Sequence, residues 1–127
     1  MSNTFVKLPS GNIEIGHIRE TYEDLKGSTF QYLKWTARQA LIERKGGTSW
    51  LYTGQTYDSN YIDLVENGWT HDHCEICFMS FGDNENDYIF SSGYFNGYDW
   101  VCKSCYETII SVNNLEETLR ELPKYQA

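Results

Sequence analysis

Two short stretches decide how this chain folds: Cys74-Glu-Ile-Cys77 and Cys102-Lys-Ser-Cys105, which together hold its only four cysteines. The two Cys-x-x-Cys pairs are separated by the segment 78–101. Zinc takes four ligands in tetrahedral geometry and binds thiolates well. Each pair presents two sulfurs to one ion from a single turn, and two pairs complete its coordination. The spacing therefore predicts one structural zinc ion bound by Cys74, Cys77, Cys102 and Cys105.

The residues that follow the second pair, 106–113, predict a short helix. Cys102 and Cys105 would then lie at a helix N-terminus, where the helix dipole favours a thiolate. A cysteine knuckle, a β-hairpin and two ligands that open a helix follow one another in this order in treble-clef zinc fingers. The alternative is a zinc ribbon, in which the second knuckle leads into a strand.

Disulfide and redox chemistry are the competing interpretations of the four cysteines. The chain shows no signal-peptide pattern, and thiols in the cytosol stay reduced. A redox Cys-x-x-Cys requires one pair in a thioredoxin-like βαβ unit, not two pairs around a hairpin. The pattern thus favours zinc, and it predicts a cytoplasmic protein.

The segment between the two pairs predicts three short strands. Residues 78–82, 88–95 and 98–101 are rich in aromatic and β-branched side chains. Polar residues 83–87 and the dipeptide Asn96-Gly97 are typical of the turns between strands.

The N-terminal half predicts further elements. Strands at residues 4–8 and 13–16 flank a turn, and a short helix at 17–26 ends before Gly27. Residues 29–45 predict a helix, because a capping box precedes apolar residues at helical spacing. A hairpin of 40–44 with 48–52 across two glycines competes with that helix.

Two capped helices are predicted further along the chain. Asp58-Ser59 would cap a helix at residues 60–67 that ends at Gly68. Asn113 or Asn114 would cap a last helix before Pro123. We therefore expect a single α+β domain over residues 1–127, composed of an N-terminal α+β part (1–67), the zinc module (68–112) and the C-terminal helix (113–127).

The chain is acidic, and its acidity is concentrated in the second half. The formal net charge is −8, with +2 on residues 1–57 and −10 on residues 58–127. Four thiolates and one Zn²⁺ would bring the total to about −10. Such a field repels phosphate backbones and attracts cationic proteins. No apolar run is long enough to cross a membrane.

The sequence His71-Asp72-His73 beside the first knuckle raises the question of catalysis. HNH nucleases carry a general-base His on the hairpin of a treble clef and a metal-binding residue on the following helix. Here the two histidines precede the first Cys, and the helix predicted after Cys105 has no His. We expect the two histidines to support the ligands through hydrogen bonds, and Asp72 to fix a turn. No nucleophile elbow, P-loop or dinucleotide fingerprint is present, so no enzyme is predicted.

Gly68-Trp-Thr-His-Asp-His-Cys-Glu-Ile-Cys77, followed by Asp99-Trp-Val-Cys-Lys-Ser-Cys-Tyr106, resembles a group of small bacterial cytosolic zinc-finger proteins. Their pattern is roughly Trp-x-His-Asp-His-Cys-x-x-Cys, a hairpin, then Trp-x-Cys-x-x-Cys-[Tyr/Phe], and some of them look like immunity proteins. The match covers residues 68–106, about a third of the chain. The resemblance implies a bacterial, non-enzymatic, zinc-stabilised binding protein.

The predicted function is therefore protein binding, as an immunity protein or antitoxin that neutralises a cationic toxin domain. The residues expected to contact this partner are the loop carboxylates and two nearby aromatic rings: Asp83, Glu85, Asp87, Tyr94 and Phe95. The alternatives are a nucleic-acid-associated zinc-finger protein and an HNH-like metal-dependent nuclease. No membrane partner is expected.

Overall fold

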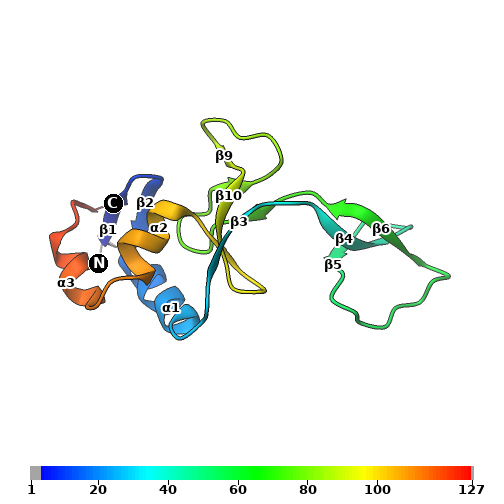
Figure 1. Cartoon of the computed structure of the whole chain (residues 1–127), viewed down its shortest axis with the longest axis horizontal. Helices are drawn as coiled ribbons and strands as arrows, with labels where there is room; N and C mark the ends of the chain where they lie inside the picture. Colours follow the sequence, from blue (N-terminus) through cyan, green and yellow to red (C-terminus); the bar gives the residue numbers. More distant parts are fainter. Residues whose placement is uncertain (1–3, 127) are drawn as a thin grey trace.

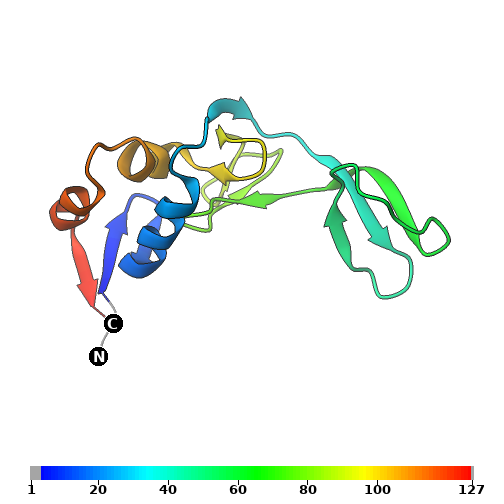
Figure 2. The ribbon, with the colours of Figure 1, turned by 90° about the horizontal axis from the view of Figure 1, so that it is seen from below.

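The computed structural model describes residues 4–126 and shows an elongated molecule with its helices at one end (Figure 1). One part, which we call the body, holds both ends of the described chain, the helices and the four cysteines. The other part, residues 38–69, extends from the body as a three-stranded sheet, and we call it the arm (Figure 2). This mixture of helices and sheets confirms the predicted α+β class.

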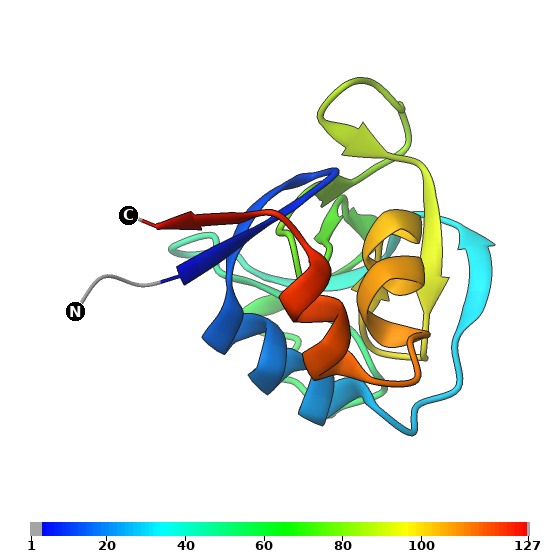
Figure 3. The ribbon, with the colours of Figure 1, turned by 90° about the vertical axis from the view of Figure 1, so that its left-hand side faces the viewer.

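A β-hairpin opens the body, as predicted. Strand β1 (Thr4–Leu8) pairs antiparallel with β2 (Gly11–Glu14), and β12 (Lys124–Gln126) pairs with the other edge of β1. This sheet brings the two ends of the described chain side by side (Figure 3). Helix α1 (Ile15–Leu25) follows at once and ends before Gly27, whose φ of 86° suits the residue after a helix.

Two small sheets lie near the cysteines. The first has the order β11-β10-β3, and the second has the order β7-β8-β9. The predicted turn at Asn96-Gly97 is confirmed, because β10 and β11 pair antiparallel around it. The hairpin expected around residues 83–87 is wrong, since β8 and β9 pair in parallel. The chain reverses within a tight turn, in which the Asn86 N–H donates to the Ile89 carbonyl at 3.1 Å, before β9 begins. The strands span Gln31–Lys34 (β3), Asp72–His73 (β7), Ser80–Phe81 (β8), Ile89–Phe90 (β9), Ser92–Phe95 (β10) and Trp100–Val101 (β11).

Two helical segments follow the second cysteine pair. Helix α2 (Lys103–Cys105) continues into η1 (Tyr106–Ile110), which confirms the predicted helix. The second part is wound as a π-helix, with the N–H of Ser111 bonded to the carbonyl of Tyr106 at 2.9 Å. Helix α3 (Leu115–Glu121) confirms the last predicted helix, and the Asn114 side chain caps it by accepting a backbone N–H at 3.1 Å.

The helix predicted over residues 29–45 is wrong. The chain instead forms β3, which pairs with β10, and then β4 (Arg38–Glu43), which pairs with β5 (Ser49–Leu51). Gly46 and Gly47 have φ values of 101° and 72°, and they form the turn of the competing hairpin. Pairing with distant strands outweighs the helical spacing, which is a purely local signal.

The helix predicted over residues 60–67 is also wrong, because β6 (Ile62–Trp69) occupies this stretch and pairs with β4. The cap at Asp58 exists, but only one turn follows it, closed by backbone bonds to the Asp58 carbonyl at 3.0 Å. Gly68 does not end a helix. It lets β6 approach β4, since a Cβ at this position would lie 3.1 Å from the Cβ of Ala40.

The hydrophobic core belongs to the body. It joins β1, β2, α1, η1 and α3 to both cysteine pairs, and Ala40 and Leu41 of the arm lie outside it. Its largest fully buried side chains are Trp35, Phe81, Ile18, Ile76 and Ile109.

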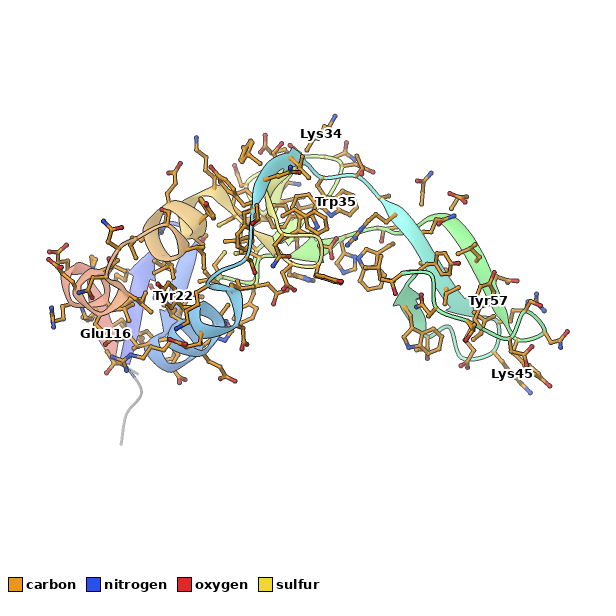
Figure 4. The ribbon with its side chains drawn as sticks, turned by 60° about the horizontal axis from the view of Figure 1, so that its bottom comes forward. Tyr22, Lys34, Trp35, Lys45, Tyr57 and Glu116 are labelled. Atoms are coloured by element: carbon orange, nitrogen blue, oxygen red, sulfur yellow. The ribbon has the colours of Figure 1, made fainter. Side chains whose placement is uncertain are left out.

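Asp72 joins the arm to the body. Its carboxylate accepts the indole N–H of Trp35 at 2.9 Å and that of Trp69 at 3.0 Å. The guanidinium of Arg38 lies 3.9 Å from the same carboxylate and 5.2 Å from the centre of the Phe95 ring. Trp35 precedes β4 at the base of the arm (Figure 4), and Trp69 ends β6. The Asp72 carboxylate therefore links the two chain segments that join the arm to the body. The sequence alone predicts only that Asp72 fixes a turn.

Replacing Asp72 by Ala should lower the free energy of unfolding by about 2–4 kcal/mol, because two indole N–H groups would lose their acceptor. Asp72→Asn keeps one acceptor oxygen and should lose less. Urea unfolding followed by tryptophan fluorescence measures both effects. Asp83→Ala, at an exposed position, is the matched control, and equal stability of Asp72→Ala and Asp83→Ala would contradict the role given to Asp72.

Candidate metal centre

The four cysteine sulfurs meet at one place in the body. All four Sγ atoms lie within 4.8 Å of one another, and those of Cys77 and Cys102 are 3.8 Å apart. A tetrahedral ion with metal–sulfur bonds of about 2.3 Å requires about 3.8 Å between its sulfurs. The four residues are buried and carry free thiols. The cluster therefore fits a four-coordinate metal ion.

The first pair is held in a tight turn. The N–H of Cys74 donates to the carbonyl of Met79 at 2.8 Å, and the N–H of Phe78 donates back to the carbonyl of Cys74 at 2.9 Å. Phe78 has a φ of 65°, a left-handed conformation that non-glycine residues rarely adopt. The strained conformation therefore lies at the residue that directly follows the second ligand of the first pair.

The second pair opens the helical segment. Cys102 is the N-cap residue of α2, and its sulfur accepts the N–H of Cys105 at 3.4 Å. The N–H of Cys102 in turn donates to the sulfur of Cys74 at 3.3 Å. Backbone N–H groups directed at sulfur stabilise thiolates, and so does the N-terminal end of a helix.

Strand β11 brings the two pairs together. The carbonyl of Trp100 accepts the N–H of Glu75 at 3.0 Å, and Cys74 forms a parallel bridge with Trp100. Trp100 lies just before Cys102 in the sequence, so this contact sets the first turn beside the second. The segment between the pairs, 78–101, thus closes into a loop whose ends are joined through backbone as well as through sulfur.

Hydrogen bonds among the clustered thiols shift their pKa values in opposite directions. Hydrogen bonds from the side chains of Cys102 and Cys105 hold the pKa of Cys77 well below its usual range. The pKa of Cys105 is raised, mainly by a hydrogen bond with the side chain of Cys102 and also by hydrogen bonds with Cys74 and Cys77. A metal ion would replace the thiol protons, so metal binding should release protons and weaken in acid.

The donor set indicates a structural metal. Four protein sulfurs fill a tetrahedral shell, and no position is left for a reacting water or substrate. Ser10 approaches from the N-terminal hairpin, with its Oγ 3.8 Å from the sulfur of Cys105. Contacts of this kind connect the metal centre to the rest of the core.

His17 supports the first knuckle, and sequence reasoning missed it. Its Nε2 lies 2.9 Å from the carbonyl oxygen of Glu75 and 3.4 Å from the hydroxyl of Thr21, one turn further along α1. Its ring lies 4.7 Å from that of Phe78, centre to centre. His17 is far from Cys74 in the sequence, so only the docking of α1 against the knuckle shows the connection.

The two histidines expected to support the ligands do not do so. His71 and His73 are exposed, and their rings pack perpendicular to each other with centres 5.2 Å apart. Among residues 4–126, no hydrogen bond joins either ring to a cysteine sulfur. His17 takes the role that was predicted for them.

The residues predicted to contact a partner fall into two groups. Asp83, Glu85 and Asp87 are exposed on the loop between β8 and β9. Tyr94 stacks on Tyr106 with ring centres 3.7 Å apart and packs edge-on against Tyr32. Phe95 stacks on Trp100 at 4.7 Å, beneath the Arg38 guanidinium.

Comparison with known proteins found no family model, curated protein or solved structure that matches this chain. The resemblance noted over residues 68–106 therefore stays a prediction. In the part of the chain that the structure describes, no helix is both long and apolar enough to cross a membrane.

We predict one metal ion per chain, lost when a ligand is replaced. Cys77→Ser should abolish stoichiometric binding and unfold much of the body, because the folding free energy of such sites comes largely from the metal. Elemental analysis and circular dichroism measure the two effects. Ser104→Ala, inside the second pair but not a ligand, is the control. A metal-free protein with its thiols oxidised in pairs would contradict the site.

His17→Ala should keep the metal but release it faster, by about tenfold, because the knuckle loses the hydrogen bond at Glu75. The measurement is the rate of metal transfer to a chromogenic chelator. His73→Ala, exposed and close in sequence to Cys74, should transfer metal at the rate of the unmodified protein. Equal transfer rates for His17→Ala and His73→Ala would contradict the proposal that His17 stabilises the metal centre.

Proposed function

We propose that this chain is a zinc-stabilised protein-binding module, acting as a bacterial immunity protein or antitoxin that neutralises a cationic protein and catalyses no reaction itself. The observation that carries the proposal is an exposed acidic loop on a body that is itself strongly acidic. Toxins that act on nucleic acids or nucleotides need basic clefts to hold phosphate. An acidic projection is complementary to such a cleft.

Zinc is the metal that this donor set favours. Four thiolates at tetrahedral spacing suit Zn²⁺, and hard cations such as Mg²⁺ and Ca²⁺ prefer oxygen ligands. The order of the elements supports a treble clef over a zinc ribbon. A knuckle is followed by the antiparallel pair β10–β11, and the second cysteine pair then opens a helix instead of a strand.

The loop between β8 and β9 is well placed to contact a partner. It rises from the body on the side away from helices α1 and α3 (Figures 1 and 3). Its ends are closed by a bond from the Gly82 N–H to the Phe90 carbonyl at 2.9 Å, and the Asn86 side chain accepts the N–H of Tyr88 at 2.7 Å. The carboxylates are thus carried on a loop with defined internal bonds, which limits the entropy lost on binding.

Tyr88 adds an aromatic anchor to the same loop. It is 76% exposed, and the rings of Tyr94 and Phe95 are already engaged in stacks within the chain. Exposed tyrosine next to carboxylates suits an interface in which charge accelerates encounter and an aromatic contact prolongs the complex. We therefore propose Tyr88 as the principal anchor, with Tyr94 and Phe95 as secondary contacts.

The two rival functions have less support. A nucleic-acid-binding zinc finger would need a basic surface, and the chain carries a net charge of −8. An HNH-like nuclease would need a metal-binding His or Asn on the helical segment after the second cysteine pair, and residues 103–110 contain neither.

Reversing the loop charges with Asp83→Lys, Glu85→Lys and Asp87→Lys should slow association with the basic partner by about tenfold or more at low salt. The salt dependence of the association rate should become flatter, and the zinc content should not change. The partner is first captured from the native host and identified by mass spectrometry, and stopped-flow fluorescence then gives the rates.

The matched control reverses three exposed carboxylates on helices, with Glu20→Lys, Glu117→Lys and Glu121→Lys. It changes the net charge by the same amount but leaves the loop intact, so a much smaller effect is expected. Two results would overturn the proposal: capture of nucleic acid or acidic proteins alone, or equal slowing by both triple variants.

A further inference from the structure

The arm presents a row of apolar side chains across its sheet. Strand β4 pairs with β5 and β6 in a register that sets Leu41 opposite Trp50 on one side and opposite Leu64 on the other. Residues directly opposite one another in a sheet share a face. Trp50 is 41% exposed and Leu64 is 37% exposed, and Leu41 is buried between them. The row therefore forms an apolar strip whose two ends, Trp50 and Leu64, are partly exposed to solvent.

The arm buries little apolar surface within its own chain. Ala40 and Leu41 are its only buried apolar residues, and both lie outside the core of the body. A three-stranded sheet with an apolar face can be stable in water, and burying exposed apolar surface on that face stabilises it further. Among residues 4–126, Trp50 and Leu64 lie outside the buried core, and both stay partly exposed. Contact with another molecule would cover them.

The distribution of charge favours a second copy of the chain. The arm carries three basic and four acidic side chains, a net charge of −1, so the rest of the chain carries −7. Lys45 lies toward the outer end of the arm and Glu116 lies at the opposite end of the molecule (Figure 4). Two copies that meet through their arms keep their acidic bodies apart, which limits repulsion. A cationic partner would instead be drawn to the body.

We propose that two copies of the chain associate through their arms. The strip Trp50–Leu41–Leu64 of one copy packs on the same strip of the other about a two-fold axis. A two-fold interface uses the same patch on both subunits, and the flat face of a sheet suits face-to-face packing. The proposed toxin-binding loop lies on the body, so this inference does not depend on the proposed function.

The test is the oligomeric state of the metal-loaded full-length chain, measured by sedimentation equilibrium and light scattering at several salt concentrations. The expected result is a dimer that tightens as salt rises, because salt screens the repulsion between the bodies. Trp50→Glu and Leu64→Glu should each weaken the dimer by about a hundredfold or more, since each would place carboxylates in the apolar contact. Tyr98→Glu, at an exposed aromatic of the body, should leave the dimer unchanged.

A second measurement needs no variant. Amide hydrogen exchange of β4, β5 and β6 in the unmodified chain should slow as protein concentration rises, and exchange of β1 and β2 should not. Metal content and circular dichroism show whether the Glu variants stay folded. A monomer at all concentrations up to about 1 mM, arm exchange that is independent of concentration, or a dimer that survives both folded arm variants would each overturn the proposal.

Discussion

Four sulfur atoms within 4.8 Å of one another cannot all be thiolates unless a cation lies among them, and the body is built around this constraint. Both cysteine pairs contribute to the hydrophobic core, so the charge of the cluster has to be balanced in a buried setting. The backbone N–H groups of Cys102 and Cys105 donate hydrogen bonds to neighbouring sulfurs, and these bonds stabilise negative charge on the sulfurs. Helix α1 then packs against the knuckle through His17, so this helix and the hairpin before it are also tied to the metal centre.

The arm obeys a different constraint, because its only firm attachment is at its base. Asp72 lies just before Cys74, at the start of the metal-binding half, and both indoles at the base of the arm donate to it. When metal binding fixes the chain near Cys74, it also fixes the Asp72 carboxylate, and this carboxylate in turn orders the base of the arm. Beyond that point the arm has two strand–strand pairings and only two buried apolar residues. Its outer part should be the least protected region of an isolated monomer.

The sequence predicts the metal centre better than the fold of the arm, and the reason is physical. Cysteine spacing, the Asn114 cap and the Asn96-Gly97 turn are local signals whose meaning does not change with the rest of the chain. The stretches 29–45 and 60–67 also carry local helix signals, yet both enter sheets because pairing with strands distant in the sequence decides their structure. His17 was missed for the same reason, since its contact with Glu75 is visible only after α1 has docked.

The separation of an acidic body from a nearly neutral arm allows two kinds of contact that need not compete. The proposed attraction of a cationic protein to the loop of the body should weaken as salt rises, and the proposed contact between arms should become stronger as the repulsion between bodies is screened. A cationic partner bound to each body would itself neutralise part of that repulsion. Occupied bodies would then pair more readily than empty ones, and by linkage paired arms would raise the affinity of the bodies for the partner. The coupling would need no conformational change, because it arises from charge alone and acts across the length of the molecule.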